Sequence, residues 1–151
     1  MTTNSALPLP EHVLRHSGCV LLLHEILEHS EEQTIASVDV SRQSWLKRRD
    51  GTVDPWVAIE YMAQCFAAHE GLIAISRNLD LPRGFLIGVN QLRLYSPKIG
   101  ANTSLHVRTK SSRGRPGLGA LSHACAVFRV EANSGSTLLA EGRLTVSTTG
   151  G

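Results

Sequence analysis

The segment at 54–65, "DPWVAIEYMAQC", limits the possible folds more than any other part of this sequence. Asp54 can cap free backbone N–H groups and Pro55 suits the first helical position, so the segment predicts the start of a helix. We expect the helix to run from 55 to about 77, where "RNLDLPRG" supplies helix-breaking residues. A helix that is apolar on nearly every side must be covered on nearly every side.

Strand-like segments lie on both sides of this helix. Two precede it, at 19–28 and 33–40, and the polar link "HSEE" between them indicates a hairpin. Four follow it, at 84–95, 104–111, 119–131 and 137–147. This order predicts an α+β domain of the hot-dog type, in which a curved antiparallel β-sheet wraps one long central α-helix.

Alternation along the last two strands predicts which side chains share one face of the sheet. On the first of them these are Ala124, Ala126, Phe128 and Val130, and on the second they are Leu138, Ala140, Leu144 and Val146. The link "SSRGRPGLG" between the predicted strands at 104–111 and 119–131 is rich in glycine and serine, which predicts a hairpin turn.

The composition fits a single globular domain. The chain has 151 residues, of which 42% are hydrophobic, and its formal charge of +2 is too small to indicate nucleic acid or a membrane surface as a partner. The N-terminus lacks the features of a signal peptide, and the longest apolar run, "CVLLL", is too short to cross a bilayer. We therefore expect a cytoplasmic protein with an N-terminal extension at 1–14, a hot-dog domain at 15–148 and a flexible tail at 149–151.

The cysteines and histidines do not form a metal-binding or disulfide pattern. Cys19, Cys65 and Cys125 are odd in number and lie far apart in apolar stretches, which predicts buried free thiols. No two of the seven histidines have ligand spacing with a third ligand, so we expect no metal site.

Motifs along the chain resemble the 3-hydroxyacyl-acyl-carrier-protein dehydratases of the FabZ and FabA type, and more particularly the divergent ApeP-like proteins of aryl-polyene gene clusters. The likeness runs from about Arg15 to Val146. It rests on "RHSGCVLLLHEILE", on "IEYMAQ", which is similar to the helix motif Glu-x-Met-Ala-Gln, on "FLIGVNQLRLYSPKIGANTSLHV", and on "AEGRLTV". These motifs are specific for the fold rather than for one activity.

The resemblance implies a catalytic role for Glu60. In the similar dehydratases the helix carboxylate enters a site at the dimer interface, where a histidine of the other subunit removes the α-proton of a 3-hydroxyacyl thioester. The acid then protonates the departing hydroxyl, and amide groups near the helix start polarise the thioester carbonyl. The likeness implies substrate binding by Asp54, Pro55, Trp56 and Val57. It also implies no cofactor beyond the phosphopantetheine of an acyl carrier protein.

The surroundings of Glu60 bear on this role. An apolar helix would disfavour the charged form of the carboxyl group, as a general acid requires. The alternative is a buried acid satisfied by an arginine or by Tyr61. Gln64 shares the face of Glu60 one turn further on, where it can orient the carboxylate, bind the substrate or simply pack.

The loop before the helix departs from the family pattern. The dehydratases carry their histidine there, in a Gly-His-Phe-Pro-Gly-type loop, but the equivalent "SWLKRRDGTVDPW" contains none. His16 is the candidate substitute within this chain, His24 either lines the site or faces solvent, and His69 is expected to be structural or near an interface. The remaining histidines are expected on the surface or on strand faces: His12, His29, His106 and His123.

The same loop carries Lys47, Arg48 and Arg49. This cluster can attract an acidic carrier protein or the phosphate of its phosphopantetheine arm, and a solvated charged loop is an equal alternative.

Three hypotheses about function remain. The chain is a dehydratase subunit whose histidine comes from a partner, a thioesterase-like hydrolase that uses Glu60 to activate water, or a non-catalytic carrier-binding subunit. In each case we expect a homodimer or a heterodimer with a second hot-dog protein, because one sheet around one helix leaves an exposed edge.

Overall fold

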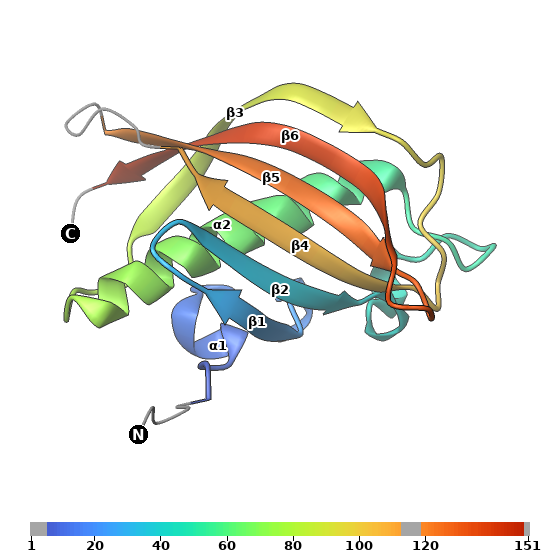
Figure 1. The fold of residues 1–151 in the computed structure, drawn as a ribbon, viewed down its shortest axis with the longest axis horizontal. Coiled ribbons are helices and arrows are strands. Elements are labelled where there is room, and N and C mark those ends of the chain that lie inside the picture. The colour runs from blue at the N-terminus through green and yellow to red at the C-terminus, as the bar shows by residue number, and fades with distance from the viewer. Residues whose placement is uncertain (1–5, 113–118, 150–151) are drawn as a thin grey trace.

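A six-stranded antiparallel sheet curves around one long helix (Figure 1). The structure is a computed structural model that describes residues 6–112 and 119–149. The strands are β1 (Glu25–His29), β2 (Gln33–Asp39), β3 (Arg83–Leu94), β4 (Ser104–Ser111), β5 (Ala120–Val130) and β6 (Ser136–Thr149), in the spatial order β1-β2-β4-β5-β6-β3. The predicted hot-dog fold is confirmed.

The central helix α2 (Ala58–Ser76) lies on the concave side of the sheet (Figure 1). It follows a 3-10 turn at Pro55–Val57, so the predicted helix is confirmed with a tighter first turn. The predicted cap is wrong, because the Asp54 side chain makes no capping hydrogen bond and instead accepts one from Arg48 Nη1 at 2.8 Å. A 3-10 turn tightens the helix start and leaves this carboxylate free for the arginine.

The core lies between α2 and the strands β2, β4 and β5. It includes fully buried Tyr61, Met62 and Cys65 of the helix, against Leu105 and other strand residues. Within the described part of the chain, none of the helices combines the length and the hydrophobicity that a membrane span requires.

Of the four β5 side chains predicted to share a face, only Ala126 is buried, whereas most of the four on β6 are buried or pack against the core. His123, Cys125 and Val127 are buried, and Ala124 is exposed. Both faces of β5 carry apolar or small residues, so alternation alone could not choose between them. On β6, Ala140 and Leu144 are buried, and Val146 packs against the core. Leu138 pairs with Phe128 beyond a bulge and is outside the core.

The segment predicted as the start of the first strand is largely not a strand. Gly18–Val20 forms a 3-10 turn, and β1 begins only at Glu25. Cys19 is exposed, so the prediction of three buried thiols is wrong for Cys19 and right for Cys65 and Cys125. Burial raises the pKa of Cys125 to about 11, which makes this thiol a poor nucleophile.

The N-terminal segment packs against the central helix. The short helix α1 (Pro10–Val13) lies beside α2, and Val13 and Leu14 are buried in the core (Figure 1). The domain boundary at residue 15 stays a prediction, although core packing already begins before it. The predicted flexible tail is wrong for Thr149, which is the last residue of β6, and residues 150–151 and most of the predicted turn in "SSRGRPGLG" fall outside the described residues.

Strand β3 is an edge of the sheet and is hydrogen-bonded to β6 alone. Five consecutive residues at its start are exposed, among them Phe85, Leu86 and Ile87. The opposite edge strand, β1, carries the exposed charges of Glu25 and Glu28. Charged side chains protect a sheet edge from pairing, whereas an apolar edge is open to it.

Candidate active site

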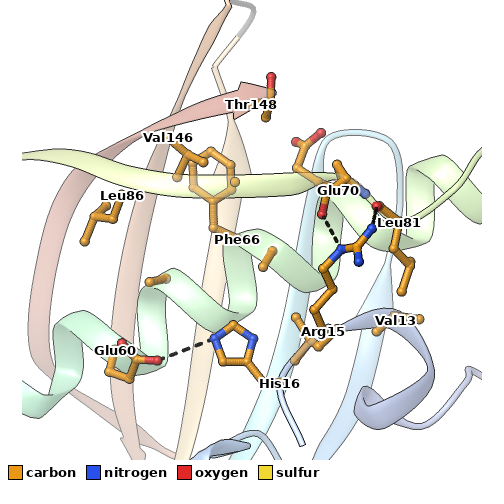
Figure 2. Close-up of a pocket in the computed structure, with 15 residues that line it drawn as sticks. Val13, Arg15, His16, Glu60, Phe66, Glu70, Leu81, Leu86, Val146 and Thr148 are labelled. Atoms are coloured by element: carbon orange, nitrogen blue, oxygen red, sulfur yellow. Dashed lines mark hydrogen bonds and ion pairs between the residues drawn. The ribbon is translucent and has the colours of Figure 1, made fainter. Parts of the chain in front are cut away.

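A pocket of about 220 Å³ opens along one side of α2 (Figure 2). It lies between the helix, the segment 13–16, the connection at 81–82 and the strands β3 and β6. Most of its wall is apolar, and its ionisable side chains are Arg15, His16, Glu60 and Glu70.

Glu60 and His16 face each other at the pocket (Figure 2). The His16 Nε2 and Glu60 Oε1 atoms are 3.8 Å apart, and the two side chains are 37% and 50% exposed. The Nδ1 atom of His16 is buried and has no hydrogen-bond partner among the described residues. The two predicted catalytic residues are therefore brought together, close enough for a proton to pass between them after a small movement.

Gln64 fixes the orientation of Glu60. Its side chain is fully buried, its Nε2 donates to Glu60 Oε1 at 2.9 Å and to the Val20 carbonyl at 2.7 Å, and its Oε1 accepts from the Leu22 N–H at 2.8 Å. These contacts use both the nitrogen and the oxygen of the side-chain amide. Of the roles that the sequence left open for Gln64, the orienting role fits this geometry.

The alternative in which Glu60 is a buried acid paired with Tyr61 or an arginine is wrong. The Tyr61 hydroxyl donates to Gln43 Oε1 at 2.7 Å, and burial raises the pKa of this phenol. Glu60 itself is half exposed, so the expectation that the helix alone would desolvate it is also wrong. The reason is that the sheet of this chain leaves the side of α2 with Glu60, Ala63 and Ala67 partly uncovered.

The residues predicted to bind substrate at the helix start lie apart from the lining of this pocket. Asp54, Pro55, Trp56 and Val57 form the 3-10 turn before α2, where Asp54 pairs with Arg48 and Trp56 is exposed. Their role in binding stays a prediction.

The basic loop is exposed at Arg48 and Arg49, and Lys47 is half-buried. Lys47 Nζ donates to the Ser41 carbonyl at 3.0 Å, Arg48 pairs with Asp54, and Arg49 is exposed. His24 lies outside the pocket lining, where its Nδ1 is 3.2 Å from Arg42 Nη1. Within the described ranges, no group of three His, Cys, Asp or Glu side chains is arranged to hold a metal ion.

A second carboxylate, Glu70, lines the same pocket and was missed by the sequence interpretation. Its Oε1 lies 3.1 Å from Nε2 of His123, which is buried on β5 rather than on the surface. The position of Glu70 was detectable, because it follows Glu60 at a spacing that returns to a similar side of a helix. No sequence signal could have found its contact with His123, which depends on the packing of α2 on β5.

A curved antiparallel sheet around one long helix defines the hot-dog fold, and here the carboxylate of Glu60 on that helix reaches a lateral pocket. Within this fold class, the chain belongs to the ApeP dehydratase family, because the model of that family matches residues 8–149. A search of curated proteins gave no match.

Solved structures with the same fold include the dehydratase heterocomplex ApeI:P from Xenorhabdus doucetiae. That chain is 22% identical, with a TM-score of 0.85 over 95% of this chain and 93% of its own. The PaaI protein from the phenylacetic acid degradation operon of E. coli is 10% identical, with a TM-score of 0.61 over 84% and 80%. Thioesterase superfamily member 2 from Mus musculus is 14% identical, with a TM-score of 0.58 over 83% and 80%. At these identities the likeness establishes the fold.

Proposed function

We propose that this chain is the Glu60-bearing subunit of a hot-dog dehydratase that acts on 3-hydroxyacyl thioesters of an acyl carrier protein, in fatty-acid or aryl-polyene-type biosynthesis. The observation that carries the proposal is the carboxylate of Glu60, which Gln64 holds at an apolar pocket in a member of the ApeP dehydratase family. The product is the trans-2-enoyl thioester.

The proposed reaction is a β-elimination. A base takes the proton from C2, the C2–C3 double bond forms, and the hydroxyl leaves C3 as water with the proton of the Glu60 carboxyl group. The resulting carboxylate needs a new proton for the next cycle. His16, 3.8 Å away, is placed to exchange it.

The base comes from a second hot-dog subunit in this proposal. The loop before α2 holds no histidine, and its arginines remain protonated at neutral pH. A partner that pairs with the β3 edge would cover Phe85 and Ile87 and close the pocket beside Leu86. The dehydratase heterocomplex among the similar structures supports a heteromeric partner.

The carrier protein is proposed to dock on the loop with Lys47, Arg48 and Arg49. This loop precedes the start of α2, and the exposed Trp45 and Trp56 stand before and after the basic residues in sequence. Arginine and lysine side chains suit an acidic protein or a phosphate group, and Arg48 and Arg49 are exposed. The phosphopantetheine arm of the carrier would then bring the thioester to the helix start, and no separate cofactor is required.

The test is to purify the chain alone and with a hot-dog protein encoded beside it that has the Gly-His-Phe-Pro-Gly-type loop. Both samples are assayed for enoyl-thioester formation from 3-hydroxyacyl carrier protein. We expect activity from the pair and little from the chain alone, because general acid–base catalysis contributes about a hundred- to ten-thousand-fold. Ordinary dehydratase rates from the chain alone would show that the base is internal, and His16 would then be the first residue to replace.

Glu60→Gln tests the acid. We expect the turnover of the pair to fall by at least about a hundred-fold, because glutamine keeps the shape of the side chain and cannot give up a proton in this way. The free energy of unfolding of the variant should differ from that of the wild type by less than about 0.5 kcal/mol, as for other exposed positions. Glu28→Gln on β1 is the matched control. Unchanged turnover in Glu60→Gln, or thiol release from acyl thioesters by the chain alone, would favour the non-catalytic or hydrolase hypothesis instead.

A further inference from the structure

The pocket extends along α2 from Glu60 to a second carboxylate. Glu60, Ala63, Ala67 and Glu70 all line it, at helix positions i, i+3, i+7 and i+10. A helix rises 1.5 Å per residue, so the backbones of the two glutamates are about 15 Å apart along the axis. Figure 2 shows Glu60 with His16 on one side of Phe66 and Glu70 on the other.

The stretch between the two carboxylates suits an apolar chain. The small side chains of Ala63 and Ala67 leave room along the helix, and Phe66, Leu86 and Val146 supply apolar walls. If the reacting carbons of a thioester lie at Glu60, as in the proposed function, the rest of its acyl group follows this stretch and its far end approaches Glu70.

Glu70 is held in a defined position at that end. It is 22% exposed, and its Oε1 pairs with Nε2 of His123, which is 1% exposed. Thr109 Oγ1 lies 2.9 Å from the other ring nitrogen of His123, and the ring stacks on Phe66 with centroids 3.7 Å apart. When His123 is neutral with its proton on Nε2, that nitrogen faces the Glu70 carboxylate and Nδ1 accepts from the threonine hydroxyl.

The dehydration chemistry makes no use of Glu70. A carboxylate in a largely apolar pocket is costly unless it has hydrogen-bond donors, and a carboxylate has more acceptor positions than the one that faces His123. A substrate group that donates a hydrogen bond at this end would therefore bind better than a methyl group.

Charge at this end favours a neutral donor. Arg15 lines the same part of the pocket, where its Nη2 donates to the Leu81 carbonyl at 2.6 Å (Figure 2). Its guanidinium opposes an ammonium group on the substrate, and Glu70 opposes a carboxylate. A hydroxyl group meets neither repulsion.

We propose that Glu70 is a specificity-determining residue that selects acyl chains ending in a hydroxyl group. This inference rests on the proposed function, since it requires the same pocket to hold the acyl part of the thioester. His123 is a positioning residue that keeps the Glu70 carboxylate turned to the chain end.

The test compares methyl-ended and hydroxyl-ended saturated acyl pantetheines, from hexanoyl to dodecanoyl, by titration calorimetry with the chain and with its complex with the partner. We expect a hydroxyl-ended ligand of one matching length to bind about ten-fold more tightly than its methyl-ended counterpart, as for one hydrogen bond to a charged group. Glu70→Met should reverse this preference, and Glu28→Gln should preserve it. Equal affinities at every length in both samples would overturn the inference.

Ala67→Leu tests the path of the chain. The larger side chain fills the stretch between the two glutamates, so we expect it to weaken binding of the long ligands and to spare hexanoyl pantetheine. Equal effects on all lengths would show that the chain does not run toward Glu70.

Measurements of turnover distinguish a failure of this inference from a failure of the proposed function. If the pair dehydrates 3-hydroxyacyl thioesters with and without a terminal hydroxyl equally well, the function stands and the selection by Glu70 is wrong. If the chain prefers hydroxyl-ended ligands while the pair forms no enoyl thioester, the pocket inference stands and the dehydratase proposal is wrong.

Discussion

Three histidine side chains, from β1, α2 and β5, pack together. The rings of His69 and His123 have centroids 5.3 Å apart, those of His29 and His69 are 5.4 Å apart, and Thr34 Oγ1 lies within 2.9 Å of Nδ1 in both His29 and His69. Burial lowers the pKa of His69 from 6.5 to about 4, the neighbouring charge of His123 adds to this shift, and that of Glu70 opposes it. Burial also lowers the pKa of His29.

His69 should therefore make stability depend on pH. Below pH 6.5, His69 binds a proton in the unfolded chain but not in the folded chain. The free energy of unfolding is therefore highest above about pH 6.5 and falls as the pH drops toward 4. A shift of this size corresponds to about 3 kcal/mol. We expect urea unfolding to show this loss of stability, and we expect His69→Gln to make stability depend less on pH.

His12→Gln is the control for this experiment, because His12 is exposed. It should leave the slope of stability against pH unchanged. If His69→Gln keeps the wild-type slope between about pH 6.5 and 4, the protonation of His69 does not drive the loss.

The close contact between α1 and α2 depends on a glycine. A Cβ atom added to Gly71 would lie 2.1 Å from the carbonyl oxygen of Val13, so no side chain fits without moving the N-terminal segment. His16 follows this segment directly and reaches Glu60 only because the segment lies against the helix.

Gly71→Ala should destabilise the chain although alanine is the better helix former. The gain in helix propensity is about 1 kcal/mol, but the added methyl group collides with backbone rather than with a flexible side chain. We expect a net loss of stability in urea unfolding and reduced turnover of the pair, because His16 moves away from Glu60.

Gly135→Ala provides the comparison, since its nearest contact would be the Asn133 side chain at 3.4 Å. A stabilised Gly71→Ala protein with normal turnover would contradict the role of this contact in placing His16.

The whole molecule has two unlike sheet edges. The β1 edge carries glutamates, and the β3 edge carries adjacent exposed apolar side chains. Adjacent exposed apolar side chains are typical of an interaction surface, and the open side of the pocket lies beside them.

Ile87→Lys should weaken assembly with the partner, because it places a charge on the proposed edge of contact. We expect analytical ultracentrifugation to show separate subunits at micromolar concentration, and turnover to fall with the loss of the pair. Leu27→Lys on β1 is the matched change at the opposite edge and should leave assembly intact. Assembly that survives Ile87→Lys and fails with Leu27→Lys would move the interface to β1.

The sequence by itself determined the order of the strands along the chain, the central helix, and Glu60 as the candidate catalytic acid. Each of these depends on local hydrophobic patterns and short motifs. The sequence misjudged the helix cap, because a neighbouring arginine binds the Asp54 side chain, and it could not tell which of the two apolar faces of β5 is buried. Only the tertiary structure placed His16 beside Glu60, and Glu70 beside His123. These contacts join segments far apart in the chain, so they follow from packing between elements, which no local pattern records.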